Sequence, residues 1–135
     1  MADYGEVPSF SSVNYQLISL GPKNEDTLAH TLLNTCLDEG VDAILPIRNS
    51  EVAAVAKAKI LFNEFNITVL LPDAAVVDRY LNVAFGKTEN WLVLDKGEVL
   101  FANQELETHT IEPGLSGAFY STAIDGAVKL TLITI

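Results

Sequence analysis

The segment from Gly40 to Asp73 constrains the fold more than any other part of the chain. It starts with a short apolar stretch, passes through the polar run Arg48-Asn49-Ser50-Glu51, continues with helical spacing of apolar residues and ends in a second apolar stretch. This order is typical of a strand, a loop, a helix and a second, parallel strand. Because open α/β sheets bind ligands beyond the carboxyl ends of their strands, the polar run is a candidate site.

Strand and helix patterns alternate three times over the first two thirds of the chain. The expected strands cover residues 15–20, 41–47 and 67–71, and the expected helices cover residues 24–39, 50–66 and 74–83. This alternation predicts a mostly parallel sheet with right-handed crossovers. The strand at 41–47 is mostly apolar, which predicts burial on both of its faces.

Local signals predict where the helices begin and end. Asn24 is expected to cap the first helix and Gly40 to follow its last turn. Asn49 or Ser50 is expected to cap the second helix, and Asp73 the third. The apolar stripe expected on the first helix is Leu28, Leu32, Leu33, Cys36 and Leu37. The stripe expected on the second is Ala54, Ala58, Leu61, Phe62 and Phe65, with Lys57, Lys59 and Glu64 facing outward.

The last third of the chain has a different pattern, which predicts a β-hairpin-rich tail. Apolar stretches flank Asp95-Lys96-Gly97 and again flank Asp125-Gly126, and both turns are typical of hairpins. This tail could pair with the α/β part or form a small sheet of its own. The apolar run at 128–135 would favour aggregation if exposed, so we expect it to be paired or covered. We therefore expect one domain, 1–135, with an α/β part at 1–85 and a β-rich extension at 86–135.

Composition limits the classes of function. The chain has 135 residues, 49% of them hydrophobic and 19% charged, which suits a folded domain with a core. Its net charge of -10 argues against binding to nucleic acid or to an anionic membrane surface, because both need a basic patch. The start of the chain lacks the basic and apolar regions of a signal peptide, and a cytoplasmic location is expected.

Most motifs that carry chemistry are missing from the sequence. It contains no GxGxxG, no phosphate-binding P-loop, no zinc spacing and no nucleophile elbow. Cys36 is expected in the core, and His30 and His109 are expected to be solvated or half-buried. Glu105, Glu107 and Glu112 could gather around a metal, although a solvated acidic loop is the simpler interpretation. We therefore expect no catalytic residues and no metal site.

The remaining constellation is the polar run, for which two interpretations stay open. Arg48 could hold a carboxylate or phosphate through two hydrogen bonds, with the helix N-terminus near Asn49, Ser50 and Glu51 offering N–H groups. Alternatively, Asn49 or Ser50 is a plain helix cap and Arg48 pairs with Glu51 on the surface.

The segment from Ala29 to Asp78 resembles the pre-ATP-grasp, N-terminal domain of ATP-grasp enzymes related to the large subunit of carbamoyl-phosphate synthase. The likeness rests on the strand at 41–46, the acidic Glu51 in the following loop, the Ala- and Leu-rich helix and the stretch Asn66-Ile67-Thr68-Val69-Leu70-Leu71-Pro72-Asp73. The resemblance implies a small three-layer α/β/α, Rossmann-like fold with a mostly parallel sheet. It also implies Lys87, in Gly86-Lys87, as the counterpart of a lysine that opens the ATP-binding domain.

The chain departs from this family in several respects. No strand with a Gly-rich turn precedes Tyr15, and the chain is too short to hold the nucleotide-binding domain. The stretches 95–100 and 125–135 are similar to strands near the end of an ATP-grasp domain, but Thr134 stands where an acidic metal ligand belongs. A neutral hydroxyl does not replace a carboxylate at a Mg²⁺ site. ATP and Mg²⁺ are therefore expected only if another chain completes the site.

Three functions follow as expectations. The first is a non-catalytic accessory or interaction domain of the pre-ATP-grasp type. The second is a binding domain for a small anionic metabolite or nucleotide, with Arg48, Asn49, Ser50, Glu51 and Lys87 as ligand-binding residues. The third is part of an ATP-grasp-type ligase that another chain completes. A homodimer is expected in each case, because the tail offers strand edges.

Overall fold

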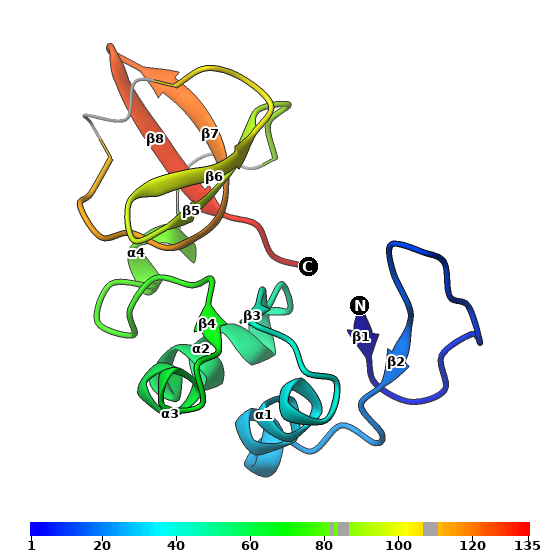
Figure 1. Ribbon diagram of the computed structural model, residues 1–135. Coiled ribbons are helices and arrows are strands. Elements are labelled where there is room, and N and C mark those ends of the chain that lie inside the picture. The colour runs from blue at the N-terminus through cyan, green and yellow to red at the C-terminus, as the bar shows by residue number, and fades with distance from the viewer. Residues whose placement is uncertain (82, 84–86, 107–110) are drawn as a thin grey trace. The chain divides into compact units, whose positions relative to one another are not determined.

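The computed structural model describes residues 1–81, 83, 87–106 and 111–135 (Figure 1). It contains both helices and strands, so the fold is mixed α/β. The chain divides into two compact units, Met1–Val41 and Asp42–Ile135. The expected single domain with a division near residue 85 stays a prediction. Among the described residues, no helix has the length and apolar character that crossing a membrane requires.

The first unit contains a two-stranded parallel sheet and one helix. β1 (Ala2–Asp3) pairs with β2 (Ile18–Ser19), and a short 3₁₀ helix, η1 (Glu25–Thr27), leads into α1 (Leu28–Asp38). The expected cap is confirmed, because the Asn24 side chain accepts a 3.0 Å hydrogen bond from the backbone N–H of Asp26. Gly40 is confirmed beyond the helix end, where its φ of 64° suits glycine.

The expected apolar stripe of α1 is largely confirmed. Leu28, Leu32, Leu33 and Cys36 are buried. Leu37 is 43% exposed, so its assignment to the core was wrong. Leu37 lies about 100° around the helix from Cys36 and so at the border of the apolar stripe. At this border a small rotation of the helix decides whether a side chain is buried or exposed.

The second unit begins with the expected strand–helix–strand segment. β3 (Ala43–Ile44) pairs in parallel with β4 (Thr68–Val69), and two helices connect them, α2 (Asn49–Lys57) and α3 (Lys59–Glu64). The single helix expected over 50–66 is wrong, because Ala58 adopts φ −91° and ψ 6°. The N–H of Ala58 bonds to the carbonyls of both Ala54 and Val55. The second of these is a 3₁₀-type bond, which tightens the last turn of α2 and ends the helix.

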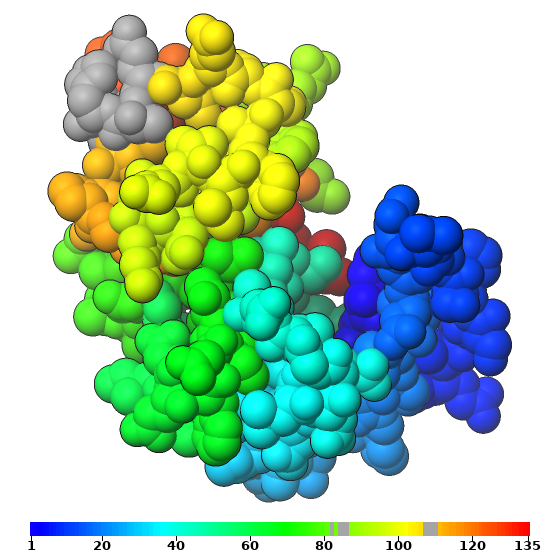
Figure 2. Space-filling model, in the orientation of Figure 1, coloured from blue at the N-terminus to red at the C-terminus, as the bar shows by residue number. Residues whose placement is uncertain are grey.

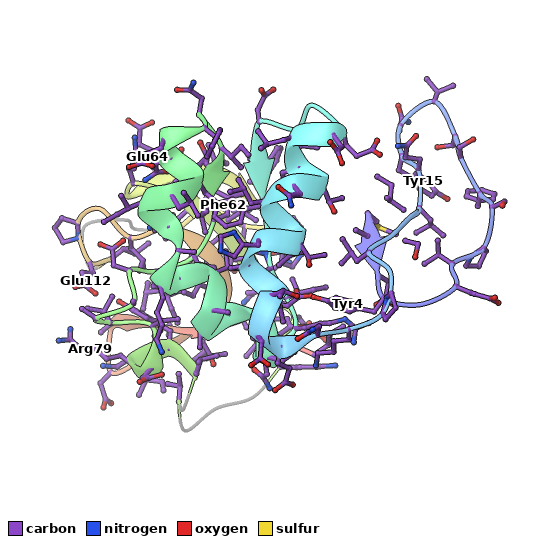
Figure 3. All side chains as sticks on the ribbon, turned by 90° about the horizontal axis from the view of Figure 1, so that it is seen from below. Tyr4, Tyr15, Phe62, Glu64, Arg79 and Glu112 are labelled. Atoms are coloured by element: carbon purple, nitrogen blue, oxygen red, sulfur yellow. The ribbon has the colours of Figure 1, made fainter. Side chains whose placement is uncertain are left out.

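The break at Ala58 changes which side chains are buried. Val52, Val55, Ala56 and Phe62 are buried, so Phe62 is the only fully buried member of the expected stripe. Phe65 is 48% exposed, and Ala54, Ala58 and Leu61 are half-buried. Figure 3 shows Phe62 beside its helix among other side chains and Glu64 on the outer side of the helix, as expected for Glu64. The expected stripe assumed one continuous helical period through Ala58, which the structure does not have.

Two further expectations for this segment are wrong. The strand at 41–47 is not buried on both faces, because Ala43 is exposed and Ile44 is half-buried. The helix expected over 74–83 is reduced to α4 (Asp78–Leu81). The residues before α4 form turns instead, in which the N–H groups of Val76 and Val77 both bond to the carbonyl of Asp73.

The tail forms its own four-stranded antiparallel sheet, and both expected hairpins are confirmed. The strands are β5 (Trp91–Asp95), β6 (Glu98–Ala102), β7 (Gly117–Ile124) and β8 (Ala127–Leu132), in the order β6-β5-β7-β8. The first turn has positive φ at Lys96 and Gly97 and the second at Asp125 and Gly126. These conformations match the right-handed twist of the flanking strands. Residues 128–132 of the apolar run are paired with β7 as part of β8, as expected, whereas Ile135 is 67% exposed.

The expectation of a mostly parallel, three-layer Rossmann-like sheet is wrong. Each parallel pairing, β1 with β2 and β3 with β4, involves only two strands, and the largest sheet is antiparallel. The physical reason lies in the connections: strands joined by two-residue turns must pair antiparallel, whereas parallel strands need a long crossover. Only the β3 to β4 segment provides a helical crossover in the described part of the second unit.

Candidate functional site

The polar run Arg48 to Glu51 forms the start of α2. The N-cap position is Arg48, with φ −85° and ψ 130°, and no side chain caps the helix there. The expectation that Asn49 or Ser50 is the cap is therefore wrong, and both lie exposed in the first turn. Glu51 is only 7% exposed, so the expected surface position of its side chain is also wrong.

Most backbone N–H groups of this turn are already engaged. The N–H groups of Glu51 and Val52 bond to the carbonyl of Arg48 at 2.9 and 3.2 Å, and that of Asn49 bonds to the carbonyl of Ile135 at 3.4 Å. Ile135 in turn donates to the carbonyl of Ile47 at 2.7 Å. An anion at a helix N-terminus needs several free N–H groups, and here only that of Ser50 has no acceptor within the described residues.

Lys87 lies outside this turn. It is exposed in the segment before β5, and it makes no hydrogen bond or ion pair within the described part of the chain. Arg48, Asn49, Ser50 and Glu51 lie together because they are consecutive residues at the start of α2. Lys87 forms no hydrogen bond or ion pair with them within the described residues. The assignment of these five residues to a ligand site stays a prediction.

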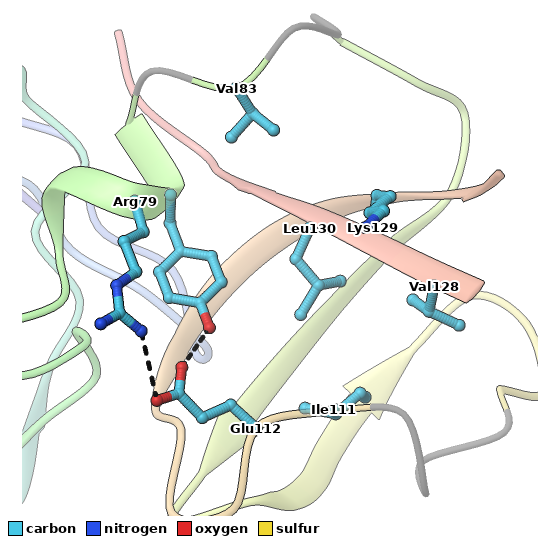
Figure 4. A pocket seen from close by; sticks show the side chains of 8 residues that line it. Arg79, Val83, Ile111, Glu112, Val128, Lys129 and Leu130 are labelled. Carbon is cyan, nitrogen blue, oxygen red and sulfur yellow. Dashed lines mark hydrogen bonds and ion pairs between the residues drawn. The ribbon is translucent and has the colours of Figure 1, made fainter.

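A second candidate site lies in the unit Asp42–Ile135, where α4, the segment at 111–112 and β8 line a partly open pocket of about 290 Å³ (Figure 4). Its lining combines charged and aliphatic side chains. The residues are Arg79, Tyr80, Val83, Ile111, Glu112, Val128, Lys129 and Leu130. Small-molecule sites in proteins start at about 300 Å³, so this volume suits only a small ligand.

Tyr80 is held in this cavity by three neighbours. Its hydroxyl donates a 2.6 Å hydrogen bond to Oε2 of Glu112, and its ring packs edge-on against Phe119, with 5.4 Å between the ring centroids. The Thr131 hydroxyl donates to the backbone carbonyl of Tyr80 at 3.1 Å. These contacts attach α4 to the antiparallel sheet and fix the position of the phenol.

Glu112 connects the phenol to a cation. Nη1 of Arg79 lies 3.9 Å from Oε1 of Glu112, whereas Tyr80 contacts the other carboxylate oxygen, Oε2 (Figure 4). Burial raises the pKa of Tyr80 to about 12, helped by the hydrogen bond and negative charge of Glu112 and opposed by the charge of Arg79. At neutral pH the phenol therefore keeps its proton and acts as a donor to Glu112.

The charges around the cavity differ in sign from those of the whole chain. Arg79 and Lys129 bring two positive charges and Glu112 one negative charge, so the lining carries +1 in a chain of net charge -10. The Arg79 side chain is 69% exposed, which leaves guanidinium N–H groups open to a ligand. The exposed guanidinium is the group of this lining that suits contact with an anion.

The sequence did not indicate this second site. The sequence indicates a solvated acidic loop or, alternatively, a metal site for Glu112, and it places Arg79 and Tyr80 in the expected third helix without a role. Tyr80 and Glu112 are 32 positions apart in the chain, and no local motif links them. The one sequence feature that bears on this site is the carboxylate of Glu112 in the turn-rich stretch before β7.

The remaining cysteine, histidine and glutamate candidates from the sequence need no role in a site. Cys36 is buried, as expected, and burial raises the pKa of its thiol, which disfavours the reactive thiolate. His30 and Glu105 are exposed, whereas Glu107 and His109 lie outside the described residues. Within the residues that the structure describes, no group of His, Cys, Asp and Glu side chains could hold a metal ion.

No protein-family model, no curated protein and no solved structure matches the chain. Function must therefore be inferred from the residues and their geometry.

Proposed function

We propose that the chain is a non-catalytic interaction domain that pairs with a second copy of itself through β6. The observation that carries this proposal is the exposure of β6, whose residues Val99, Leu100 and Phe101 are 40%, 46% and 65% exposed. Three consecutive exposed apolar residues on a strand are unusual on a surface that faces only water. In Figure 2, the yellow residues that include β6 lie on the surface of the face shown.

The position of β6 in its sheet gives a reason for this exposure. β6 is the first strand in the order β6-β5-β7-β8, so among the described residues it pairs with β5 on one side only. The other side of an edge strand presents unpaired N–H and C=O groups, which an added strand can satisfy. The described residues of β6 include one charge, Glu98, which gives little protection against such pairing.

The charge of Glu98 favours an antiparallel arrangement about a two-fold axis. A parallel pairing would bring the two Glu98 carboxylates side by side. An antiparallel pairing of the five-residue strands moves them to opposite ends, about 14 Å apart at ~3.4 Å per residue, which exceeds the Debye length of about 8 Å. A second copy presents the same edge, as an isologous two-fold interface requires.

The relation to pre-ATP-grasp domains forms part of the same proposal. It is supported by the β3–α2–α3–β4 segment, in which two parallel strands are joined by a helical crossover. This segment is also where the sequence likeness between Ala29 and Asp78 is strongest. Under this proposal the domain does not turn over ATP, and ATP and Mg²⁺ would enter only with another chain that completes a ligase.

Sedimentation equilibrium over a range of protein concentration and salt tests the dimer. Two chains of charge -10 repel each other, so we expect dimerisation to strengthen as NaCl rises from about 0.05 to about 0.5 M. We expect Phe101→Lys to weaken dimerisation at least about tenfold, because it places two cations in the apolar contact.

Ile60→Lys is the matched control, because Ile60 is an equally apolar side chain, 76% exposed, on α3. It should leave the dimerisation constant unchanged. A monomer at every concentration and salt level would overturn the proposal, as would equal effects of the two substitutions.

A further inference from the structure

We propose that the outer face of the antiparallel sheet, over β5 and β6, docks an extended, arginine-bearing segment of a partner protein. This outer face is made of Trp91, Val93 and Asp95 of β5 together with Glu98 and Phe101 of β6. It is the surface of the sheet and not the free edge of β6, so the proposal does not rest on the dimer.

The alternation of side chains along β5 defines this face. Leu92 and Leu94 are fully buried, so the residues beside and between them point to the opposite side of the strand. Phe101 lies opposite Val93, which is two positions from Trp91 on the same strand. The residues that carry the two aromatic rings are therefore diagonal neighbours on one face, about 7 to 8 Å apart between Cα atoms.

The aromatic part of the outer face is open to solvent. Trp91 is 38% exposed and Phe101 is 65% exposed. Trp91 also lies opposite Tyr120 of β7, which is half-buried. An exposed aromatic ring can hold a planar guanidinium by stacking and by cation–π attraction, for which tryptophan is the best side chain. This part of the face therefore suits an arginine.

The acidic part of the outer face consists of two opposed carboxylates. Asp95 and Glu98 lie directly opposite each other, and like charges in this position repel. Within the described residues neither forms an ion pair, even with Lys96 in the turn between them. The Ser116 hydroxyl donates to Oδ1 of Asp95 at 3.4 Å, and no group in the described part of the chain donates to Oδ2. A guanidinium between the carboxylates would neutralise the repulsion and bind bidentately.

The spacing along β5 defines the segment that fits. Trp91 and Asp95 are the first and last residues of the strand, about 14 Å apart at ~3.4 Å per residue. An extended segment spans the same distance with arginines at positions i and i+4. One guanidinium then binds Asp95 and Glu98 while the other stacks on Trp91. The net charge of -10 attracts such a cationic segment and repels an anionic one.

Fluorescence titration tests the site directly, because Trp91 is the only tryptophan of the chain. The probe is a five-residue peptide with blocked termini, arginine at both ends and serine, glycine and serine between them. We expect a saturable change in the emission of Trp91. Binding should be at least about fivefold weaker in about 0.5 M NaCl than in about 0.05 M, which is the opposite of the salt dependence expected for the dimer.

The double variant Asp95→Asn/Glu98→Gln removes both negative charges and keeps the shapes of the side chains. We expect it to bind the peptide at least about tenfold more weakly than wild type. Asp38→Asn/Glu64→Gln is the matched control, because it changes the net charge equally. Both of its sites are exposed, and their side chains form no hydrogen bond or ion pair within the described residues. It should bind the peptide as wild type does.

A peptide with citrulline in place of arginine keeps the shape of the probe, loses its charge and should bind at least about tenfold more weakly. Absence of a Trp91 response to the arginine peptide in wild type would overturn the proposal. Equal affinities of wild type and Asp95→Asn/Glu98→Gln would also overturn it. This variant should still dimerise, because it keeps the apolar residues of β6, so loss of the peptide site and loss of the dimer are distinguishable.

Discussion

The hydroxyl of Tyr80 and the carboxylate of Glu112 form a 2.6 Å hydrogen bond that joins α4 to the segment preceding β7. Nη1 of Arg79 lies 3.9 Å from the same carboxylate, so Glu112 accepts a hydrogen bond from a phenol and forms an ion pair with a guanidinium. The contact spans 32 positions of the chain. It therefore stabilises tertiary structure and not only the local turn, and its removal should be measurable in the free energy of unfolding.

Tyr80→Phe should lower the free energy of unfolding by about 1 kcal/mol, because it deletes the hydrogen bond and keeps the ring contact with Phe119. Urea unfolding followed by far-UV circular dichroism measures the change. Tyr120→Phe is the control: Tyr120 lies half-buried on β7, and its hydroxyl makes no hydrogen bond within the described residues. An equal loss in both variants would contradict the role given to Glu112.

Alkaline pH should destabilise the fold through Tyr80. Its pKa is raised to about 12, mainly by burial, whereas tyrosine in an unfolded chain titrates near the ordinary value of 10. The folded protein thus holds the proton more strongly. The resulting contribution to stability is complete below pH 10 and is lost as pH rises from about 10 towards 12.

The loss over this range should be smaller in Tyr80→Phe, which has no phenol to titrate at this position. Urea unfolding at several pH values compares the two proteins, and the ultraviolet absorbance of tyrosinate follows the titration directly. Parallel pH profiles for wild type and Tyr80→Phe would contradict the expectation.

Lys59 should contribute to stability although the sequence places it on the outward face. Its Nζ donates to the carbonyl of Leu71 and to Oδ1 of Asp73, both at 2.8 Å, and its side chain is 19% exposed. Lys59→Met should lower the free energy of unfolding by about 1 kcal/mol, because the Leu71 carbonyl loses its donor. Lys57→Met, at an exposed position of α2, should change it by less than about 0.5 kcal/mol.

Gly117 should tolerate no side chain. A Cβ there would lie 2.9 Å from Cζ of Phe119 and 3.2 Å from Cδ1 of Leu132, and its φ is 142°. Both neighbours are buried, so neither can move without disturbing the core. Gly117→Ala should cost about 2 to 4 kcal/mol in thermal or urea unfolding, from the clash together with backbone strain.

Gly126→Ala separates the steric clash from the backbone strain. Gly126 has a φ of 78° and open space around its would-be Cβ, so the alanine variant should lose only about 1 kcal/mol, from backbone strain. A loss as large as that of Gly117→Ala would show that the clash with Phe119 contributes little.

The parts of the fold that the sequence predicted correctly are those set by local chemistry. Asn24 has a side chain that can cap only nearby N–H groups, and Asp125-Gly126 forms a turn whose dihedral angles few residue pairs adopt. Each depends on residues within a few positions, so neither needs knowledge of the rest of the molecule.

The parts that it did not predict depend on distant contacts. Nothing in the Ala-rich stretch around Ala58 marks the break between α2 and α3, because alanine favours a continuous helix. The extent of the parallel sheet was overestimated because alternation of strands and helices does not fix how many strands pair. The cavity at Arg79 and Glu112 exists only after α4 packs against β8.

The backbone pairing of Ile135 with Ile47 and Asn49 has a consequence for folding kinetics. Its two hydrogen bonds close a loop that contains every strand from β4 to β8, whereas the β5–β6 and β7–β8 hairpins need closure of only a few residues. Closing the longer loop costs more chain entropy, so this pairing should form after the hairpins. In native-state hydrogen exchange, the amides of Asn49 and Ile135 should therefore lose protection before those within β7.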